Sequence, residues 1–223
     1  MSIEPGSLTI LFEDAQIYAI DKPIGIASIP EGNKEQKSLR ELLEAKAGQK
    51  IYVVHRLDKE VSGVILFAKN AAMHKYLNDR FSSREVQKTY RALVHGEVRD
   101  DSGVIDAPLR EFGSGRVGVD HENGKPSLTE YRVLSREGGY SLLELSPQSG
   151  RRHQLRAHLY SIGHPIVGDV RYGDRAKQQT YPRLMLHAHK IECRLPNGER
   201  LVVESALPSG ALRAPLDLRD FRC

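Results

Sequence analysis

VVHRLDKEVSGVILFAKN, residues 53–70, decides the fold because it joins two strand-like runs through a loop rich in ionisable residues. The runs at 51–54 and 64–67 consist of β-branched, aliphatic and aromatic residues, which is typical of buried β-strands. The loop between them begins with His55, Arg56, Leu57 and Asp58. Asp58 has two interpretations at this point. It begins a turn by accepting hydrogen bonds from nearby backbone amides, or it is placed to do chemistry.

The composition is that of an ordinary soluble globular protein, with 223 residues, 28% charged and 39% hydrophobic. This length provides enough core for one large domain or two small ones. No apolar run approaches the roughly 20 residues that cross a bilayer, and the first ten residues do not form a secretory signal. Two cysteines, Cys193 and Cys223, make neither a disulfide framework nor a zinc site. We therefore expect a cytoplasmic protein without a membrane partner.

Basic residues are concentrated in two blocks, although the net charge is only +4. Residues 51–100 hold 9 Lys and Arg against 6 Asp and Glu, and residues 151–200 hold 10 against 4. If the fold brings these blocks together, they form a positive surface suited to a polyanion such as RNA. Otherwise they are two solvated faces.

The coarse secondary structure is a succession of strands with three helices. Strand-like segments occur at 8–12, 17–21, 51–54, 64–67, 89–95, 128–135, 140–146, 184–194 and 200–205. Helical periodicity occurs at 37–47, 70–81 and 154–162. A Pro-Asn-Gly turn at 196–198 predicts a hairpin, and the polar stretch 111–125 suggests a surface excursion with nothing to bury. We expect a single domain over residues 1–223, with a mixed α+β fold, a mainly antiparallel β-sheet core and flanking helices.

The segment SGRRHQLRAHLYSIGHPIVGD, residues 149–169, breaks a local rule. Arg151, Arg152 and Arg156 crowd the start of a predicted helix, where the macrodipole favours anions. Broken local rules often mark functional sites. An anion from elsewhere, either Asp58 or a phosphate group, would resolve the conflict.

Five motifs in order make the sequence similar to the RluA family of RNA pseudouridine synthases over almost its whole length. The active-site motif HRLD matches 55–58 and continues into SGVILFAKN, with Val61 where the family often has Thr. The family's K-x-Y motif matches 88–90, and GRxHQ[IL]RxH with GHPIxGDxxYG matches 150–158 and 163–173. The stretches DKPIGIASIP and LMLHAHKI also resemble the family. No S4-type domain is recognisable, so we expect a stand-alone catalytic domain.

The resemblance implies a reaction in which uracil leaves C1′ of its ribose, turns, and rejoins through C5, with no cofactor. Asp58 would attack C1′ or remove a ribose proton, and both routes stay open. Arg151 would keep Asp58 ionised through a two-pronged hydrogen bond, because a lone buried carboxylate takes up a proton. Tyr90 would stack on the uracil or help to move the proton from C5.

A uridine inside folded RNA must be flipped out before C1′ can be reached. His55 and Arg56 are adjacent to Asp58, and their planar groups could stack on the displaced bases or contact phosphate. RNA contacts are also expected at the start of the third predicted helix, from Arg152, His153, Gln154 and Arg156. The expected partner is a short stem-loop of rRNA or tRNA, bound by a monomer.

The sequence gives less support to three other functions. A metal site could use some of the residues His153, His158, His164, His187 and His189, but no acidic pair accompanies them, so structural hydrogen bonding is expected. A non-catalytic RNA binder would not need Asp58. A nucleoside or glycoside hydrolase needs two carboxylates around the bond, and the second acid, Glu60, is expected to face solvent.

Overall fold

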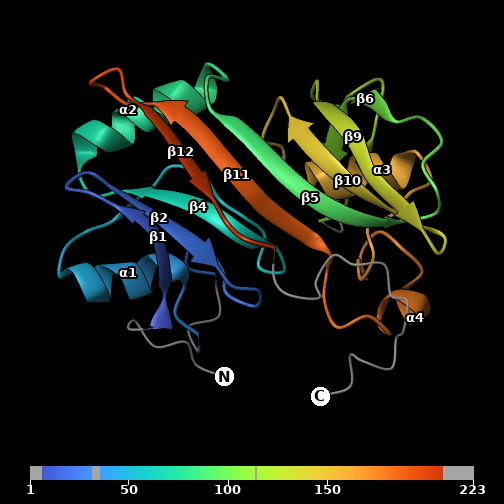
Figure 1. Ribbon diagram of the computed structural model, residues 1–223, viewed down its shortest axis with the longest axis horizontal. Helices are drawn as coiled ribbons and strands as arrows, with labels where there is room; N and C mark the ends of the chain where they lie inside the picture. Colours follow the sequence, from blue (N-terminus) through green and yellow to red (C-terminus); the bar gives the residue numbers. More distant parts are fainter. Residues whose placement is uncertain (1–6, 32–35, 114, 208–223) are drawn as a thin grey trace. The chain divides into compact units, whose positions relative to one another are not determined.

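The computed structural model describes residues 7–31, 36–113 and 115–207, so Cys223 lies outside the described residues. The chain forms two compact units (Figure 1). Among the described residues, unit 1 comprises 7–31, 36–88 and 188–206, and unit 2 comprises 89–113, 115–187 and 207. Two strands, β5 (Gln87–His95) and β11 (Leu186–Arg194), run from one unit into the other.

Unit 1 is built around strand β4 (Ser62–Ala68), whose seven residues are all buried. Strand β2 (Ile17–Lys22) pairs antiparallel with β4 on one side, and β11 neighbours β4 on the other. The remaining strands of this sheet are β1 (Thr9–Glu13), the two-residue β3 (Tyr52–Val53) and β12 (Arg200–Glu204). The sequence SGVILFA therefore forms the centre of the unit, as its unbroken apolar run predicts.

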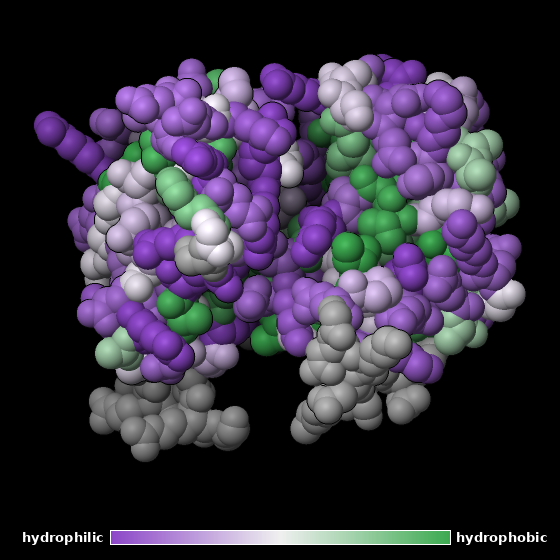
Figure 2. All heavy atoms as spheres, turned by 180° about the vertical axis from the view of Figure 1, so that it is seen from behind, coloured by the Kyte–Doolittle hydropathy of each residue, from purple (hydrophilic) through white to green (hydrophobic). Residues whose placement is uncertain are grey.

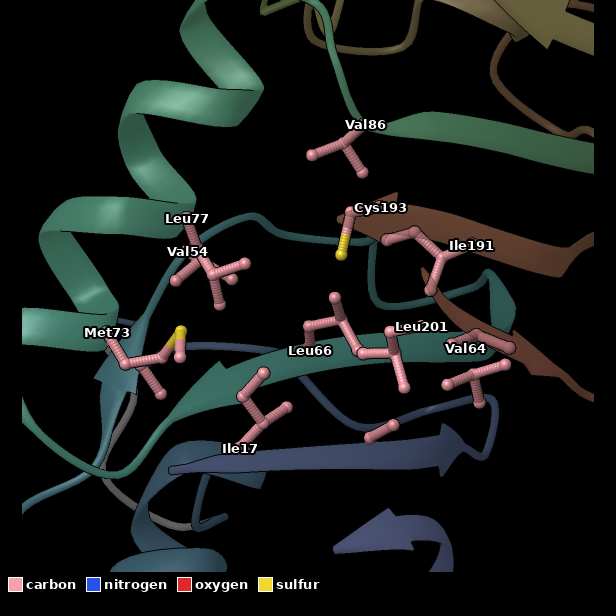
Figure 3. Packing of buried hydrophobic residues seen from close by; sticks show 13 residues of the cluster. Ile17, Val54, Val64, Leu66, Met73, Leu77, Val86, Ile191, Cys193 and Leu201 are labelled. Atoms are coloured by element: carbon pink, nitrogen blue, oxygen red, sulfur yellow. The ribbon is translucent and has the colours of Figure 1, made fainter. Parts of the chain in front are cut away.

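One face of this sheet packs against helix α2 (Ala71–Ser82). Figure 3 shows the side chains between them, including Leu66, Met73 and Leu77 with Cys193. Burial raises the pKa of the Cys193 thiol to about 11, so it behaves as a small apolar side chain. This cluster anchors both ends of the loop that carries Asp58, because Val54 and Val64 belong to it.

The two helices of unit 1 begin at side-chain caps. Helix α1 (Leu39–Ala47) has a capping box in which Ser38 and Glu41 each bond the other's backbone amide. That hydrogen bond from the Ser38 amide lowers the pKa of Glu41. Helix α2 begins at Asn70, whose Oδ1 accepts from the Met73 amide at 2.8 Å.

Unit 2 contains an antiparallel sheet formed by β5 with β6 (Ser102–Asp106), β9 (Leu128–Glu137) and β10 (Tyr140–Pro147). The order of the strands in this sheet is β5-β10-β9-β6. Helix α3 (Gln154–Ser161) packs against a separate two-stranded sheet of β7 (Leu109–Glu111) and β8 (Val117–Val119), and α4 (Arg175–Gln178) is a single turn.

The predicted α+β fold class with mainly antiparallel strands is confirmed, and all three predicted helices are present within two residues of their expected ends. One expectation was wrong. The stretch 111–125 was expected to bury nothing, yet it contributes β8 and buries Val117 beside Leu109 and Tyr172. We refer to residues 107–127 as the hairpin segment. That residues 1–223 form one catalytic domain stays a prediction.

The face shown in Figure 2 is mainly hydrophilic, with smaller hydrophobic areas. Among the described residues, the exposed large hydrophobic side chains are Ile24, Val104, Phe112, Tyr160, Ile162, Val170 and Val202. No helix in the described ranges has both the length and the apolar character needed to cross a membrane.

Candidate functional site

The loop between β3 and β4 carries Asp58, and the residue before it is fixed by a reciprocal pair of hydrogen bonds. Ser28 Oγ donates to the Leu57 carbonyl at 2.8 Å and accepts from the Leu57 amide at 3.1 Å. Ser28 and Leu57 are both buried. Because these two bonds satisfy both backbone groups of Leu57, they hold the backbone on the N-terminal side of Asp58.

A buried lysine holds the other side of the loop. The Lys59 carbonyl accepts from the Gly25 amide at 2.8 Å and from Lys22 Nζ at 3.2 Å. Lys22 is fully buried, and its ammonium also donates to the carbonyls of Pro23 and Ile26 at 3.0 and 2.9 Å. Three carbonyl acceptors match the three protons of an ammonium group, which offsets the cost of burying it. Residues of the segment 21–30 therefore hold the backbone of the Asp58 loop through hydrogen bonds.

Asp58 lies between these two fixed residues, and the polar residues around it differ in exposure. The Asp58 carbonyl closes a turn by accepting from the Val61 amide at 3.0 Å. Asp58 is half-buried, whereas Arg56 and Glu60 are exposed. The exposure of Glu60 agrees with the expectation that it faces solvent.

His55 has internal partners in unit 1. Its Nε2 accepts from the Leu66 amide at 2.9 Å, and its ring stacks on Phe81 with the centroids 4.8 Å apart. Burial, together with the charge of Lys88, lowers the pKa of His55 to about 3. Burial also lowers the pKa of Lys88. His55 is therefore neutral at pH 7, with its proton on Nδ1 because Nε2 is an acceptor.

Tyr90 lies in unit 2, on β5, opposite Leu145 of β10, and is half-buried. The start of α3 lies in the same unit. Arg151 and Arg152 are exposed there, and His153 adopts a left-handed conformation with φ 51° and no side-chain cap. A left-handed conformation is uncommon for a residue with a Cβ and often marks a functional segment.

Gln154 fixes the backbone of Arg151. Its Oε1 accepts from the Arg151 amide at 3.1 Å and from Ser149 Oγ at 2.7 Å. Its Nε2 donates to the Leu128 carbonyl and to Thr129 Oγ1 at 3.0 and 3.1 Å. Gln154 is buried, and these bonds use the carbonyl and both protons of its amide. Gln154 therefore links β9 to Arg151, the residue expected to work with Asp58.

Arg156 forms a buried, two-pronged ion pair with Asp169. The two bonds, from Nε and one terminal nitrogen, are 2.7 and 2.8 Å long. The Arg156 and Asp169 side chains are 4% and 0% exposed, so water hardly reaches the pair. Asp169 also accepts from the backbone amides of Arg171 and Tyr172. The pair ties α3 to the GHPIVGD segment that follows it.

Two cations that sequence reasoning missed lie near the start of α3. A pocket of about 340 Å³ in unit 2 is lined by Arg151 and Arg152 together with Arg110 and Lys125 of the hairpin segment. Arg152 is paired with Glu111 there. Only the concentration of charge in residues 151–200 pointed to this region, because Arg110 and Lys125 fall in a stretch with a net negative charge.

Three of the histidines considered for a metal site have structural hydrogen bonds, as expected. His158 bonds Thr129 Oγ1 and the Ala107 carbonyl, His164 bonds the His95 carbonyl, and His189 bonds the Ser205 carbonyl. In the part of the chain that the structure describes, no group of three or more His, Cys, Asp or Glu residues could hold a metal ion.

The expected site residues divide between the units. His55, Arg56 and Asp58 lie together in unit 1, and the others lie in unit 2, namely Tyr90, Arg151, Arg152, His153, Gln154 and Arg156. The pairing of Asp58 with Arg151 therefore stays a prediction.

Comparison with known proteins gives consistent matches. Residues 16–161 match the family described as RNA pseudouridylate synthase. The chain is 36% identical over 205 residues to an uncharacterised RNA pseudouridine synthase of Zymomonas mobilis, which covers 89% of this chain and 93% of that protein. It is 40% identical over 189 residues to the dual-specificity RNA pseudouridine synthase RluA of Vibrio vulnificus, which covers 82% and 76%. Other relatives are named for tRNA or for the large ribosomal subunit.

Among solved structures, the human protein RNA Pseudouridylate Synthase Domain Containing 1 is similar, with a TM-score of 0.82 and 27% identity. This match covers 93% of this chain and 86% of the human chain.

Proposed function

Because the chain belongs to the RNA pseudouridylate synthase family and is an RluA-type RNA pseudouridine synthase, we propose that Asp58 is its catalytic carboxylate. The substrate in this proposal is a specific uridine in a stem-loop of rRNA or tRNA. The names of the relatives support this substrate class, since they include tRNA, large-subunit and dual-specificity enzymes.

The observation that carries the proposal is the bracing of the Asp58 loop. Ser28 fixes Leu57, and Lys22 with Gly25 fixes the Lys59 carbonyl, so the backbone is held on both sides of one half-buried carboxylate. A rigid support of this kind is what a catalytic group requires, because small displacements from reacting geometry reduce the rate strongly.

The proposed chemistry is an isomerisation that needs no cofactor. The bond between N1 of uracil and C1′ breaks, and a bond between C5 and C1′ forms. The proton on C5 is lost and N1 gains one, so atoms and electrons balance without an oxidant or a second substrate. Asp58 either attacks C1′ or removes a ribose proton to start the sequence.

Tyr90 and Arg151 complete the proposed catalytic set. Tyr90 stacks on the uracil or assists the loss of the C5 proton. Arg151 holds and orients the Asp58 carboxylate through a two-pronged hydrogen bond. In this account Gln154 is a positioning residue, because it fixes the Arg151 backbone from a buried position.

Base flipping is proposed to depend on Arg56. Arg56 is exposed beside Asp58 and carries a planar guanidinium group that can stack on bases. His55 is proposed to stabilise β4 and not to contact the RNA, because its ring is neutral, accepts from the Leu66 amide and stacks on Phe81. The enzyme is further proposed to act as a cytoplasmic monomer.

Pseudouridine mapping tests the proposal. Unmodified tRNA and large-subunit rRNA are incubated with the purified protein, without cofactor, beside the Asp58→Asn variant. We expect new pseudouridine at defined loop positions with the wild-type protein and none with the variant. Turnover retained by Asp58→Asn would overturn the role of Asp58, and release of free uracil would indicate a hydrolase instead.

A further inference from the structure

The pocket of about 340 Å³ in unit 2 has a composition that the reaction itself does not explain. Four cations line it, Arg110, Lys125, Arg151 and Arg152, against one carboxylate, Glu111. The reaction proposed above uses only Arg151 from this group. That reaction gives no role to the other three cations.

Two of these cations already have carboxylate partners. Arg110 pairs with Asp120 at 3.1 Å, and Arg152 pairs with Glu111. Within the described residues of unit 2, neither Lys125 nor Arg151 has a carboxylate within 4.0 Å. The pocket therefore keeps a positive charge that its own ion pairs do not neutralise.

The hairpin segment that forms one wall of the pocket is firmly held. Leu109 and Lys125 exchange two backbone hydrogen bonds of 2.9 and 2.8 Å. The Val117 amide donates to the buried hydroxyl of Tyr172 at 3.0 Å. Gly124 is required sterically, because a Cβ there would lie 2.3 Å from the Asp120 carbonyl oxygen. The cations are thus presented by a defined structure rather than by a loose loop.

The apolar part of the pocket distinguishes its ligand from a bare phosphate ion. The buried side chains of Leu109 and Val117 line it beside the cations. A nucleotide has both an anionic phosphate and a larger, less polar ribose and base. Contacts to phosphate by Arg and Lys, combined with contacts to sugar and base, are the usual pattern in RNA recognition.

We propose that this pocket binds a nucleotide of the substrate RNA other than the target uridine, with its phosphate on Lys125 and Arg110 and its ribose or base against Leu109 and Val117. The inference rests on the proposed function for the identity of the ligand as RNA. It assigns to the hairpin segment a part in the selection of the RNA.

Binding measurements with the catalytically disabled Asp58→Asn protein test this inference without requiring turnover. Affinity for the pool of unmodified tRNA and large-subunit rRNA is measured over a range of salt concentrations. Adding Lys125→Gln should weaken binding about tenfold, as for loss of a charged hydrogen bond. It should also reduce the slope of log affinity against log salt by about one.

Lys177→Gln is the matched control, because Lys177 is an exposed lysine of the same unit outside the pocket. It should leave both quantities unchanged. Thermal unfolding checks that Lys125→Gln retains its fold, and Arg110→Gln provides a second variant.

Phosphate-ethylation interference on the most enriched RNA then locates the nucleotide. Ethylation of one phosphate should weaken binding to the Asp58→Asn protein that keeps Lys125. The same ethylation should not weaken binding to the protein that also carries Lys125→Gln. Equal affinity and equal interference with and without Lys125 would overturn the inference, as would an equal loss in Lys177→Gln. Absence of pseudouridine from the wild-type reaction is a different result, which overturns the proposed function alone.

Discussion

The Asp58 loop of unit 1 and the basic pocket of unit 2 are built in opposite ways. The loop is held by two buried groups, the Ser28 hydroxyl and the Lys22 ammonium, which bond the backbone of Leu57 and Lys59. The pocket presents exposed guanidinium and ammonium groups, which are strongly hydrated and screened by salt. Buried hydrogen bonds to backbone atoms give fixed geometry, whereas exposed charges give attraction over distance. We expect changes in the loop to affect rate and changes in the pocket to affect affinity.

The largest expected effect on stability comes from the support of unit 2. Asp169→Ala removes the carboxylate that forms the two-pronged ion pair with the buried Arg156 guanidinium, which should lower the free energy of unfolding by about 3–5 kcal/mol. Urea unfolding measures this loss. Arg132→Ala removes one partner of an exposed pair with Glu144 and should cost at most about 1 kcal/mol. Equal losses in the two variants would contradict the structural role of the buried pair.

A smaller effect on stability, but a larger one on rate, is expected from the support of unit 1. Ser28→Ala leaves both backbone groups of Leu57 without a partner, at a cost of about 1–3 kcal/mol. The single-turnover rate should fall while the RNA affinity stays constant, because the Asp58 loop loses its fixed position. Asn70→Ala, which removes the cap of α2, should cost about 1 kcal/mol without changing the rate. An equal fall in rate in both variants would show that stability alone is responsible.

The smallest effect near neutral pH concerns His55. Its pKa is about 3 in the folded protein and ordinarily 6.5, so the unfolded chain binds the proton more readily. The contribution of His55 to stability is therefore complete above pH 6.5 and is lost as the pH falls from there towards 3. The loss should be at most about 1.4 kcal/mol per pH unit in that window. A His55→Gln variant should show a flatter dependence of unfolding free energy on pH; an unchanged slope would contradict the neutral ring stacked on Phe81.

Much of unit 1 could be predicted from the sequence because its signals are local. The unbroken run in 64–67 lies in the fully buried β4, and Asn70 begins α2, where the periodicity starts. Unit 2 was harder to predict. β6 contains Gly103, which packs against the ring of Tyr131 in β9, so its strand character depends on a partner nearly thirty residues away. The burial of Val117 likewise depends on Tyr172.

The candidate site was likewise predictable only where its signals are local in the sequence. The motifs indicated which residue types gather around Asp58 and at the start of α3. They could not distinguish residues that face a ligand from residues that support those that do. Gln154 and Arg156 were expected to contact RNA, a prediction that stays open, and the structure gives both of them buried internal partners. Hydrogen-bond partners distant in sequence carry no local signal, and neither did the approach of Arg110 and Lys125 to Arg151.

One experiment tests the central claim, that the loop determines turnover and the pocket determines binding. The single-turnover rate at saturating RNA and the dissociation constant are measured on one RNA for the wild-type, Asp58→Asn and Lys125→Gln proteins. We predict that Asp58→Asn loses at least about 10²–10⁴-fold in rate with unchanged affinity. Lys125→Gln should lose affinity and keep its rate. Turnover by Asp58→Asn, or a loss of rate at saturating RNA in Lys125→Gln, would contradict the account.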